Sequence, residues 1–423
     1  MIFGRRRGDD DDEDDDEEEE VEQVLFQGAQ NGQVPDLKAN AKLVQAGLIR
    51  AKELVSDAMG RRAEMIRIDP KEKVAVCTLF VDGVPYPAAK LPVQAGMAIT
   101  QMLKLLAGLD IKERSKPQTG GIQAEYAEKK WLVRVDSTPV GGGVERLIVR
   151  ISDPKVVLEK PHEIGISEEL RLKVREYAAS HEGVILAAGP PMSGTSTTAI
   201  GLLRSVDAYM YNIYNLADLQ GRDLMHITTF PPNEGEKLVT QITRAKRQEA
   251  DVMFMDPLTD AEITKVIFEE AEERSFISWL GDPKITAARL KLVVSQRLIR
   301  KVCPECRQAY RPNPKLLSKV GLPPETKVLY RVPRPVENEE GELEEPDECR
   351  KCGNIGYFGR MALFEAIELN EKVREVVASG ADATVIKAAA RESGMQSFQK
   401  DGLRAVAAGQ TTLEELQRVF AQK

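Results

Sequence analysis

Four of the five cysteines stand in two C-x-x-C pairs, Cys303 with Cys306 and Cys349 with Cys352, and 42 residues separate the pairs. Each pair can supply two thiolates to one tetrahedral Zn²⁺, and four sulfur ligands leave no position for a water molecule. The spacing therefore predicts one structural zinc ion. Thiol–disulfide chemistry is the alternative, but it would need a low-pKa thiol at a helix start near a redox fold.

A glycine-rich turn that could hold phosphate follows the apolar run 184–188. It has two glycines with four residues between them, followed by three hydroxyl side chains: Gly189, Gly194, Thr195, Ser196 and Thr197. Backbone N–H groups at such a turn present partial positive charge to an anion. The phosphate-binding motif has a lysine where Thr195 stands, whereas Ser196 keeps the position of the Mg²⁺-binding hydroxyl. Taken alone, the pattern also fits an ordinary tight turn.

An unbroken run of twelve acidic residues, Asp9 to Glu20, dominates the formal charge of −8 and leaves +4 for the rest of the chain. Such a run repels itself and buries no apolar area, so we expect residues 1–35 to be a disordered tail. It serves solubility or, alternatively, docks on the basic surface of a partner. No run approaches the roughly 18 consecutive apolar residues of a membrane span, and no signal peptide begins the sequence, so we expect a cytoplasmic protein.

The elements that position these groups form two patterns. Apolar spacing predicts a helical arm at 36–62. Residues 63–152 alternate expected strands with one helix and predict a small α/β domain, including a hairpin at 73–86 that turns at Asp82-Gly83. From residue 166, helices alternate with short apolar strands, which predicts a largely parallel sheet with helices on both faces. The expected helices are 167–180, 196–206, 235–249, 260–273 and 285–300, and three further helical stretches follow residue 371.

The glycine turn and its surroundings, HEGVILAAGPPMSGTSTTAIGLL, resemble the phosphate loop of the type II secretion and type IV pilus assembly ATPases (general secretion pathway protein E-like). The resemblance continues upstream in KLLAGLDIKERSKPQTGGI and RVDSTPVGGGVERLIVRI. Downstream it includes SQRLIRKVCPEC, CRKCGNIGYFGRMALFEAIEL and SGMQSFQKDGLRAVAAGQTTLEELQRV, so that it covers residues 63–423. Beside the α/β domain, it implies a RecA-like P-loop domain (153–300), a tetracysteine zinc module (301–360) and a C-terminal helical subdomain (361–423).

The same resemblance indicates that the family's catalytic motifs are altered in this chain. Pro257 replaces the glutamate that positions the attacking water, and proline has no group that can accept a proton. Asp256 could still hold a metal-bound water, although it stands in the place of a glycine. The histidine motif maps to residues 279–283, which contain no histidine, and the acidic box near 216–220 keeps at best Asp218.

Two arginines of the first domain, Arg134 and Arg150, match family residues that lie near the nucleotide phosphates. Ordinary ion pairs on a strand surface are the alternative for both. Whether ATP and Mg²⁺ still bind is left open by the altered motifs.

These losses predict a catalytically impaired structural or regulatory subunit. The family pattern implies a hexameric ring, formed with itself or with an active paralogue, beneath a cytoplasmic-membrane platform protein, where the chain would be peripheral to the membrane. An active ATPase that uses displaced residues is the first alternative. A nucleic-acid-binding zinc protein is the second, and the acidic tail and the lack of a basic stripe with interleaved aromatic residues argue against it.

Overall fold

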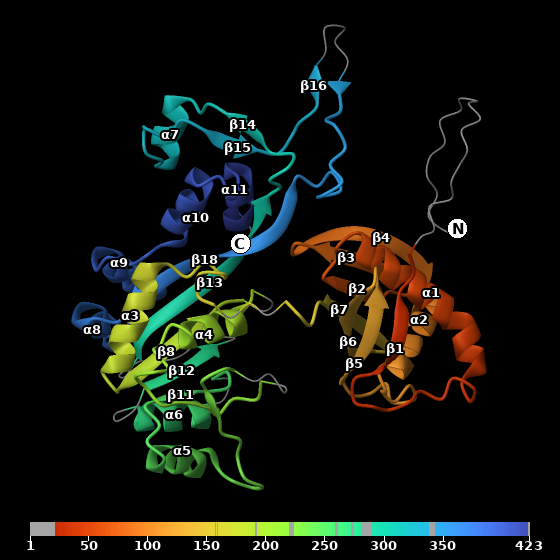
Figure 1. Cartoon of the computed structure of the whole chain (residues 1–423), viewed down its shortest axis with the longest axis horizontal. Coiled ribbons are helices and arrows are strands. Elements are labelled where there is room, and N and C mark those ends of the chain that lie inside the picture. The colour runs from red at the N-terminus through yellow and green to blue at the C-terminus, as the bar shows by residue number, and fades with distance from the viewer. Residues whose placement is uncertain are drawn as a thin grey trace. The chain divides into compact units, whose positions relative to one another are not determined.

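The computed structural model describes residues 22–156, 158, 160–190, 193–219, 224–258, 261–271, 275–280, 290–337 and 343–421. The acidic run 9–20 and the residues 281–283 of the altered histidine motif lie outside this part of the chain. The chain divides into two compact units, residues 1–156 and 157–423 (Figure 1). Within the described residues, no helix is long and apolar enough to cross a bilayer.

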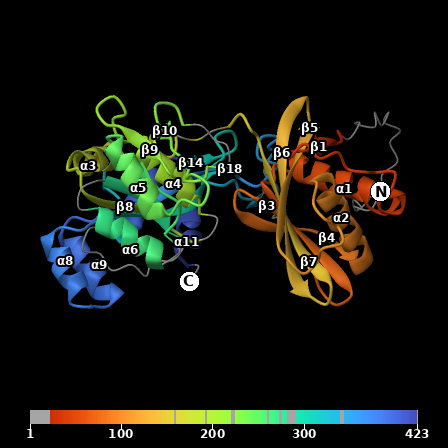
Figure 2. The same cartoon turned by 90° about the horizontal axis from the view of Figure 1, so that it is seen from below.

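The first unit is a seven-stranded antiparallel sheet with two helices on one of its sides (Figure 2). The strand order is β1-β5-β6-β7-β2-β3-β4. The strands are β1 (Leu25–Ala29), β2 (Met65–Pro70), β3 (Val74–Val81), β4 (Val84–Pro92), β5 (Gln118–Tyr126), β6 (Lys129–Gly141) and β7 (Val144–Ser152). The helices are α1 (Ala41–Gly60) and α2 (Val93–Leu106).

Alternating burial explains how β3 joins this sheet. Every second residue from Ala75 to Val81 is buried, Cys77 among them, so one side of the strand faces the core. Asp82 and Gly83 have φ values of 52° and 78°, which is the backbone twist that a tight hairpin requires. The predicted hairpin is confirmed.

The prediction of a disordered tail up to residue 35 is wrong for its described part. Residues Leu25–Ala29 form the edge strand β1, which pairs with β5, and Val24 is fully buried. Alternating burial over only five residues gives a weak signal beside twelve consecutive acids, and the pairing partner lies almost a hundred residues away. The predicted helix within 36–62 is confirmed, and α1 packs against α2.

The second unit has the predicted parallel sheet with helices on both faces. The strand order is β10-β9-β11-β12-β8-β13-β18, and the edge strand β18 alone among these pairs runs antiparallel to its neighbour. The strands are β8 (Gly183–Ala188), β9 (Ile213–Asn215), β10 (Thr228–Thr229), β11 (Val252–Phe254), β12 (Ser275–Leu280), β13 (Leu290–Val302) and β18 (Tyr357–Glu368).

Two apolar layers sandwich this sheet, because successive side chains of a strand point to opposite faces. In β8, Ile185 and Ala187 face the layer of α3 (Glu168–Ala179) and α4 (Thr195–Leu203). Val184 and Leu186 face the opposite layer. That layer is formed by α5 (Leu238–Arg247), α6 (Ala261–Glu270), α8 (Glu371–Ala378) and α9 (Ala383–Glu392).

The helix predicted at 285–300 is wrong. The described part of that range lies in β13, whose pairing with β8 and β18 satisfies its backbone on both sides. Both β13 and β18 cross the predicted domain boundaries at 300/301 and 360/361, so the cysteine module is inserted between two strands of the main sheet. Four C-terminal helices are present instead of the predicted three, since α10 (Phe398–Ala407) and α11 (Leu413–Ala421) follow α8 and α9.

Candidate functional site

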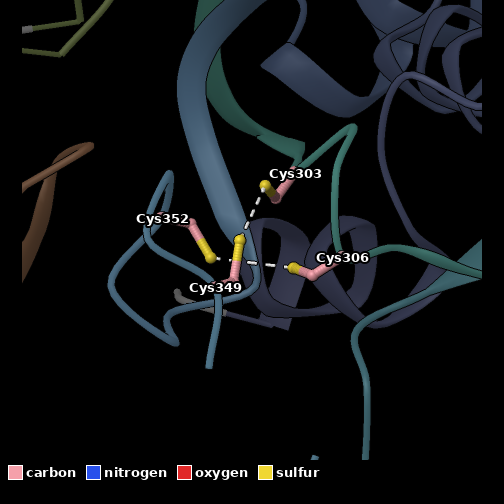
Figure 3. Close-up of side chains that lie close together, drawn as sticks. All are labelled: Cys303, Cys306, Cys349 and Cys352. Carbon is pink, nitrogen blue, oxygen red and sulfur yellow. Dashed lines mark hydrogen bonds between the residues drawn. The ribbon is translucent and has the colours of Figure 1, made fainter. Parts of the chain in front are cut away.

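The four cysteines of the two pairs come together in the second unit (Figure 3). Their sulfur atoms all lie within 4.8 Å of one another. The Cys303–Cys349 and Cys306–Cys352 sulfur separations are 3.8 and 3.7 Å. A tetrahedral ion with four sulfur bonds of about 2.3 Å holds neighbouring sulfurs about 3.8 Å apart. The arrangement therefore fits one metal ion held by four thiolates.

Strand pairing brings the two cysteine pairs together. Cys303 directly follows the last residue of β13, Val302, which is the register partner of Tyr357 at the start of β18. The N–H of Cys303 donates to the carbonyl of Gly356 at 2.9 Å, so the two ends of the insert are joined at its base. The pairing of β13 with β18 thus places two distant stretches of sequence side by side.

Tight turns orient the side chains of the second cysteine pair, Cys349 and Cys352. Gly353, Asn354 and Gly356 all have positive φ values, from 60° to 77°. The side chain of Asn354 accepts a hydrogen bond from the N–H of Cys349 at 2.7 Å, and the N–H of Gly356 donates to the sulfur of Cys352 at 3.3 Å. Such a knuckle points both sulfurs to one side of the loop, toward the first pair (Figure 3).

The ionisation of these thiols differs between positions. The N–H of Cys352 stabilises the thiolate of Cys349 and lowers its pKa to about 7. Burial raises the pKa of Cys306 and of Cys352. Metal binding must displace the protons that remain, so the affinity of the site for a metal ion rises with pH.

A buried ionic network ties the last helix to the strand that precedes the cysteines. The Glu415 side chain on α11 is fully buried and accepts hydrogen bonds from the backbone N–H and Nη2 of Arg300 at 3.1 and 2.7 Å. It also accepts from Nε and Nη2 of Arg418, at 2.7 and 2.6 Å. The Arg300 guanidinium lies 4.0 Å from the ring centroid of Tyr357 on β18. The carboxylate of Glu415 therefore balances the charge of Arg300, which lies beside both strands that carry the cysteine module, β13 and β18.

The glycine turn has the strand–turn–helix context that the sequence predicts. It joins β8 to α4, and Gly194 caps the helix with φ +88°, a conformation that side chains with a Cβ rarely adopt. A Cβ on Gly189 would lie 2.5 Å from Oγ of Ser193, so the close approach also requires glycine there. Thr195 is the first residue of α4, and Ser196 and Thr197 follow it. Residues 191 and 192 lie outside the described part of the turn.

Sequence inspection missed Gln296, which fastens this turn to β13. Its side chain is 2% exposed; Nε2 donates to the carbonyl of Ser193, and Oε1 accepts from the hydroxyl of Thr198. The amide of Gln296 therefore links the glycine turn to the first helical turn of α4. Gln296 belongs to the block SQRLIRKVCPEC, which carries part of the family resemblance. Because residues 285–300 were predicted to be a helix, the sequence did not indicate which residue of this block faces the glycine turn.

A pocket of about 770 Å³ opens beside the turn and was also missed. Its walls include Gly189 and Pro190 of the turn, and its cations are Arg297, Lys387 and Arg391. Lys387 pairs with Glu365 at 3.0 Å, and the Arg297 guanidinium lies 5.7 and 5.8 Å from the ring centroids of Phe398 and Phe420. This volume and lining suit an anionic ligand with a planar ring.

The two predicted aspartates line a different pocket, of about 620 Å³. Asp218 and Asp256 follow β9 and β11, and the N–H of Asp218 donates to Oδ1 of Asp256 at 3.1 Å. Burial raises the pKa of Asp256 against the opposing effect of this hydrogen bond. Pro257 lines the same pocket. The carboxylates are brought together with each other, but they are not among the residues that line the pocket beside the glycine turn.

The two predicted arginines belong to the first unit, whereas the glycine turn belongs to the second. Arg134 on β6 and Arg150 on β7 are direct cross-strand partners. Both donate to Asp136, Arg134 from Nε at 3.4 Å and Arg150 from Nη1. Burial, and after it the charge of Arg134, lowers the pKa of Arg150. The ion pairs expected of strand-surface arginines are therefore present.

Comparison with known proteins points to the same family that the sequence motifs resemble. A sequence profile of the family described as type II/IV secretion system protein matches residues 41–273 and 275–418. The type IV pilus assembly ATPases PilB of Thermus thermophilus and Myxococcus xanthus are 26% and 28% identical to this chain, over 86% of its length in both cases. The chain spans 42% and 66% of the lengths of these two relatives.

Among solved structures, the ATPase DotB of Legionella pneumophila aligns with 89% of this chain and 96% of its own, with a TM-score of 0.51 and 12% identity. At that identity the likeness shows the α/β fold alone.

Proposed function

The chain belongs to the type II/IV secretion system protein family, and from that premise we propose that it is a subunit of a secretion or pilus motor that has lost its own ATP hydrolysis. The observation that carries the proposal is the glycine turn, which keeps its frame but has Thr195 at the first position of α4, where the motif has lysine. A lysine there contributes a charge-assisted contact to the phosphates, of about 1.5–3 kcal/mol.

A second loss, Pro257, supports the same proposal. It follows the short strand β11, at the place of the glutamate that positions the attacking water. The missing lysine weakens phosphate binding, and the missing carboxylate removes the proton acceptor, so neither change can compensate for the other. Groups that act as a catalytic unit lose nearly all activity when one member is removed.

The cysteine cluster has a structural role in this proposal. Its sulfur separations match those of a tetrahedral zinc ion. Zinc held by Cys303, Cys306, Cys349 and Cys352 has no open position for water or substrate, so it stabilises the insert and takes no part in a reaction.

The assembly that we propose is inferred from the family resemblance and not from contacts within this chain. The subunit joins a hexameric ring with its own copies or with an active paralogue, on the cytoplasmic side of a membrane platform protein. The pocket beside the turn, with Arg297, Lys387 and Arg391, is where such a subunit would hold ATP if binding persists without hydrolysis.

One observation favours an active ATPase as the second candidate function. Burial raises the pKa of Asp256, and a carboxylate of raised pKa is a better proton acceptor. Together with Ser196, which remains available for Mg²⁺, it could serve as a displaced catalytic group.

Steady-state phosphate release by the purified chain, with ATP and Mg²⁺, decides between the two. We expect turnover at background, and calorimetry of Thr195→Lys should show tighter ATP binding, by about tenfold or more, without turnover. Ser196→Ala reveals contaminating ATPase, because it should not change a background rate. Phosphate release that is robust in the wild type and lost in both Ser196→Ala and Asp256→Asn would overturn the proposal in favour of the active enzyme.

A further inference from the structure

The insert between the two cysteine pairs consists of two parts of opposite charge. We name residues 307–334 the basic lobe and residues 336–348 the acidic hairpin. The basic lobe contains seven lysines and arginines and a single acid, Glu325, whereas the acidic hairpin contains eight acids and no cation. Two concentrations of opposite charge thus follow each other along the chain.

The basic lobe is folded against the C-terminal helices. Its elements are β14 (Gln308–Tyr310), α7 (Pro314–Val320) and β15 (Leu329–Arg331), and the two strands pair antiparallel. Leu317 of α7 is buried in one apolar cluster with Leu416 of α11. Lys315 and Lys319 are one helical turn apart, on the opposite side of α7 from Leu317. The packing of α7 therefore directs these two lysines toward solvent.

Four of the seven cations on the basic lobe are available to a partner. Three arginines are engaged within the chain: Arg307 by the carbonyl of Gly409, Arg331 by the ring of Tyr310, and Arg334 by the carboxylate of Glu414. The other four are exposed, and in the described part of the chain their side chains have no hydrogen bond or ion pair: Arg311, Lys315, Lys319 and Lys327. Glu325 can compensate at most one of them.

The acidic hairpin is a second exposed surface. Its strands β16 (Val336–Glu337) and β17 (Leu343–Glu344) pair antiparallel. Four of its acids are exposed and have no ion pair among the described residues: Glu344, Glu345, Asp347 and Glu348. The next cation in the sequence, Arg350, can compensate at most one of them, and Lys351 pairs with Glu305. The hairpin therefore keeps an excess of negative charge.

Exposed apolar side chains accompany both charged surfaces. Val336 and Leu343 on the hairpin are 62% and 71% exposed, and Val328 on the lobe is 44% exposed. Covering them removes apolar area from water, which adds to the attraction between the charges. Within the described residues no ion pair joins the lobe to the hairpin, and Figure 1 shows β14 and β15 lying between β16 and α7. The hairpin thus leaves the lysines of α7 uncovered in its own chain.

From the opposite charges and the exposed apolar side chains on both surfaces, we propose that the acidic hairpin of one copy docks on the basic lobe of a second copy of this chain. The contact is head-to-tail, because each copy offers both surfaces, and its repetition gives a closed ring or an open filament. The acidic run 9–20 fits the lobe less well, since it has no apolar residue to cover Val328. The inference does not rest on the loss of ATP hydrolysis, because neither surface lines the two pockets near the glycine turn and the aspartates.

The first test compares self-association of the full-length wild type with that of two variants, by sedimentation velocity at low salt. In the hairpin variant the six glutamates between residues 337 and 345 become glutamine, and in the lobe variant the four unpaired cations become glutamine. Each change should weaken self-association by at least about tenfold, since several charge pairs are lost together. An equimolar mixture should recover one contact per pair of chains, because one variant keeps the lobe and the other keeps the hairpin.

A matched control removes the same charge from the acidic run. In it the six acids of residues 15–20 become the corresponding amides. Self-association should change less than about twofold. Loss of association in this control, with association kept in the hairpin variant, would assign the lobe to the acidic run and overturn the proposal. So would a wild-type chain that shows no association at low salt up to about 0.1 mM.

Cross-linking gives a second measurement that stands if a variant misfolds. Zero-length carbodiimide coupling of a mixture of isotope-labelled and unlabelled wild-type chains, followed by peptide mass spectrometry, should join Glu344 or Glu345 to a lysine of the lobe between chains. High salt should suppress these products. Products that join the hairpin and the lobe only within one chain would overturn the proposal, as would a mixture of the two variants that associates no better than either variant alone.

Discussion

Replacing Glu415 with glutamine tests whether the buried network holds the end of the chain to the main sheet. The change keeps the shape but removes the charge, so the buried guanidinium of Arg300 loses its counter-ion, whereas Arg418, 32% exposed, can turn to water. An uncompensated buried charge costs about 3–5 kcal/mol. For a unit of this size we expect Tm to fall by about 10 °C, measured by calorimetry of the full chain.

A surface pair supplies the control. Glu392 pairs with Lys372 at 2.5 Å, but both side chains are more than half exposed, so Glu392→Gln should cost less than about 1 kcal/mol. If Glu415→Gln lowers Tm no more than Glu392→Gln does, then the assignment of stability to burial of the network is wrong.

The pH dependence gives an independent check on the same carboxylate. Burial alone would raise the pKa of Glu415, but the hydrogen bonds from Arg418 and Arg300 outweigh it and hold the pKa below the ordinary value of 4.5. With a folded-state pKa below that of the unfolded chain, the stabilisation is complete above pH 4.5 and disappears as the pH falls through the folded-state pKa. The difference in Tm between wild type and Glu415→Gln should therefore shrink below about pH 4.

Three further outcomes follow from other parts of the fold. Elemental analysis should find one zinc per chain, lost in Cys349→Ser and kept in Cys77→Ser, whose thiol lies in the first unit; full zinc content in Cys349→Ser would contradict the tetracysteine site. Gly194→Ala, at φ +88°, should lower the free energy of unfolding by about 1–2 kcal/mol in urea titrations, and Gly194→Asn by less, because asparagine tolerates this conformation; equal stability of both variants and wild type would mean that the turn relaxes. Deleting residues 1–29 should lower Tm far more than deleting 1–21, since only the longer deletion removes β1 and the buried Val24.

Local signals in the sequence predicted those features that depend on local chemistry. Asp82-Gly83 specifies its hairpin, and the spacing of Cys303 and Cys306 specifies a metal-binding knuckle. The strand β13 shows the limit, because its Leu, Lys, Gln and Arg residues favour helix by propensity. Its burial alternates from Leu290 to Gln296, but that period is imposed by β8 and β18, which are distant in sequence.

The candidate site likewise combines features that the sequence predicts with features that it does not. The glycine turn is contiguous in sequence, and its strand–turn–helix frame follows from the apolar run before it. The pocket beside it combines residues from the turn, β13, β18 and three C-terminal helices, so no single stretch of sequence reveals it. Gln296 was missed for that reason, since its two hydrogen-bond partners lie about a hundred residues upstream.

The pairing of Val302 with Tyr357 bears on how this protein can change during evolution. The ends of the cysteine insert are fixed by the sheet and by four sulfurs, so the free-energy cost of closing it depends only logarithmically on the number of residues between them. Doubling that number costs about 0.6 kcal/mol. Descendants of the chain can therefore lengthen, shorten or exchange the stretch between Cys306 and Cys349 while the strands beneath keep their register, so a new recognition element could be acquired at this place without refolding the rest.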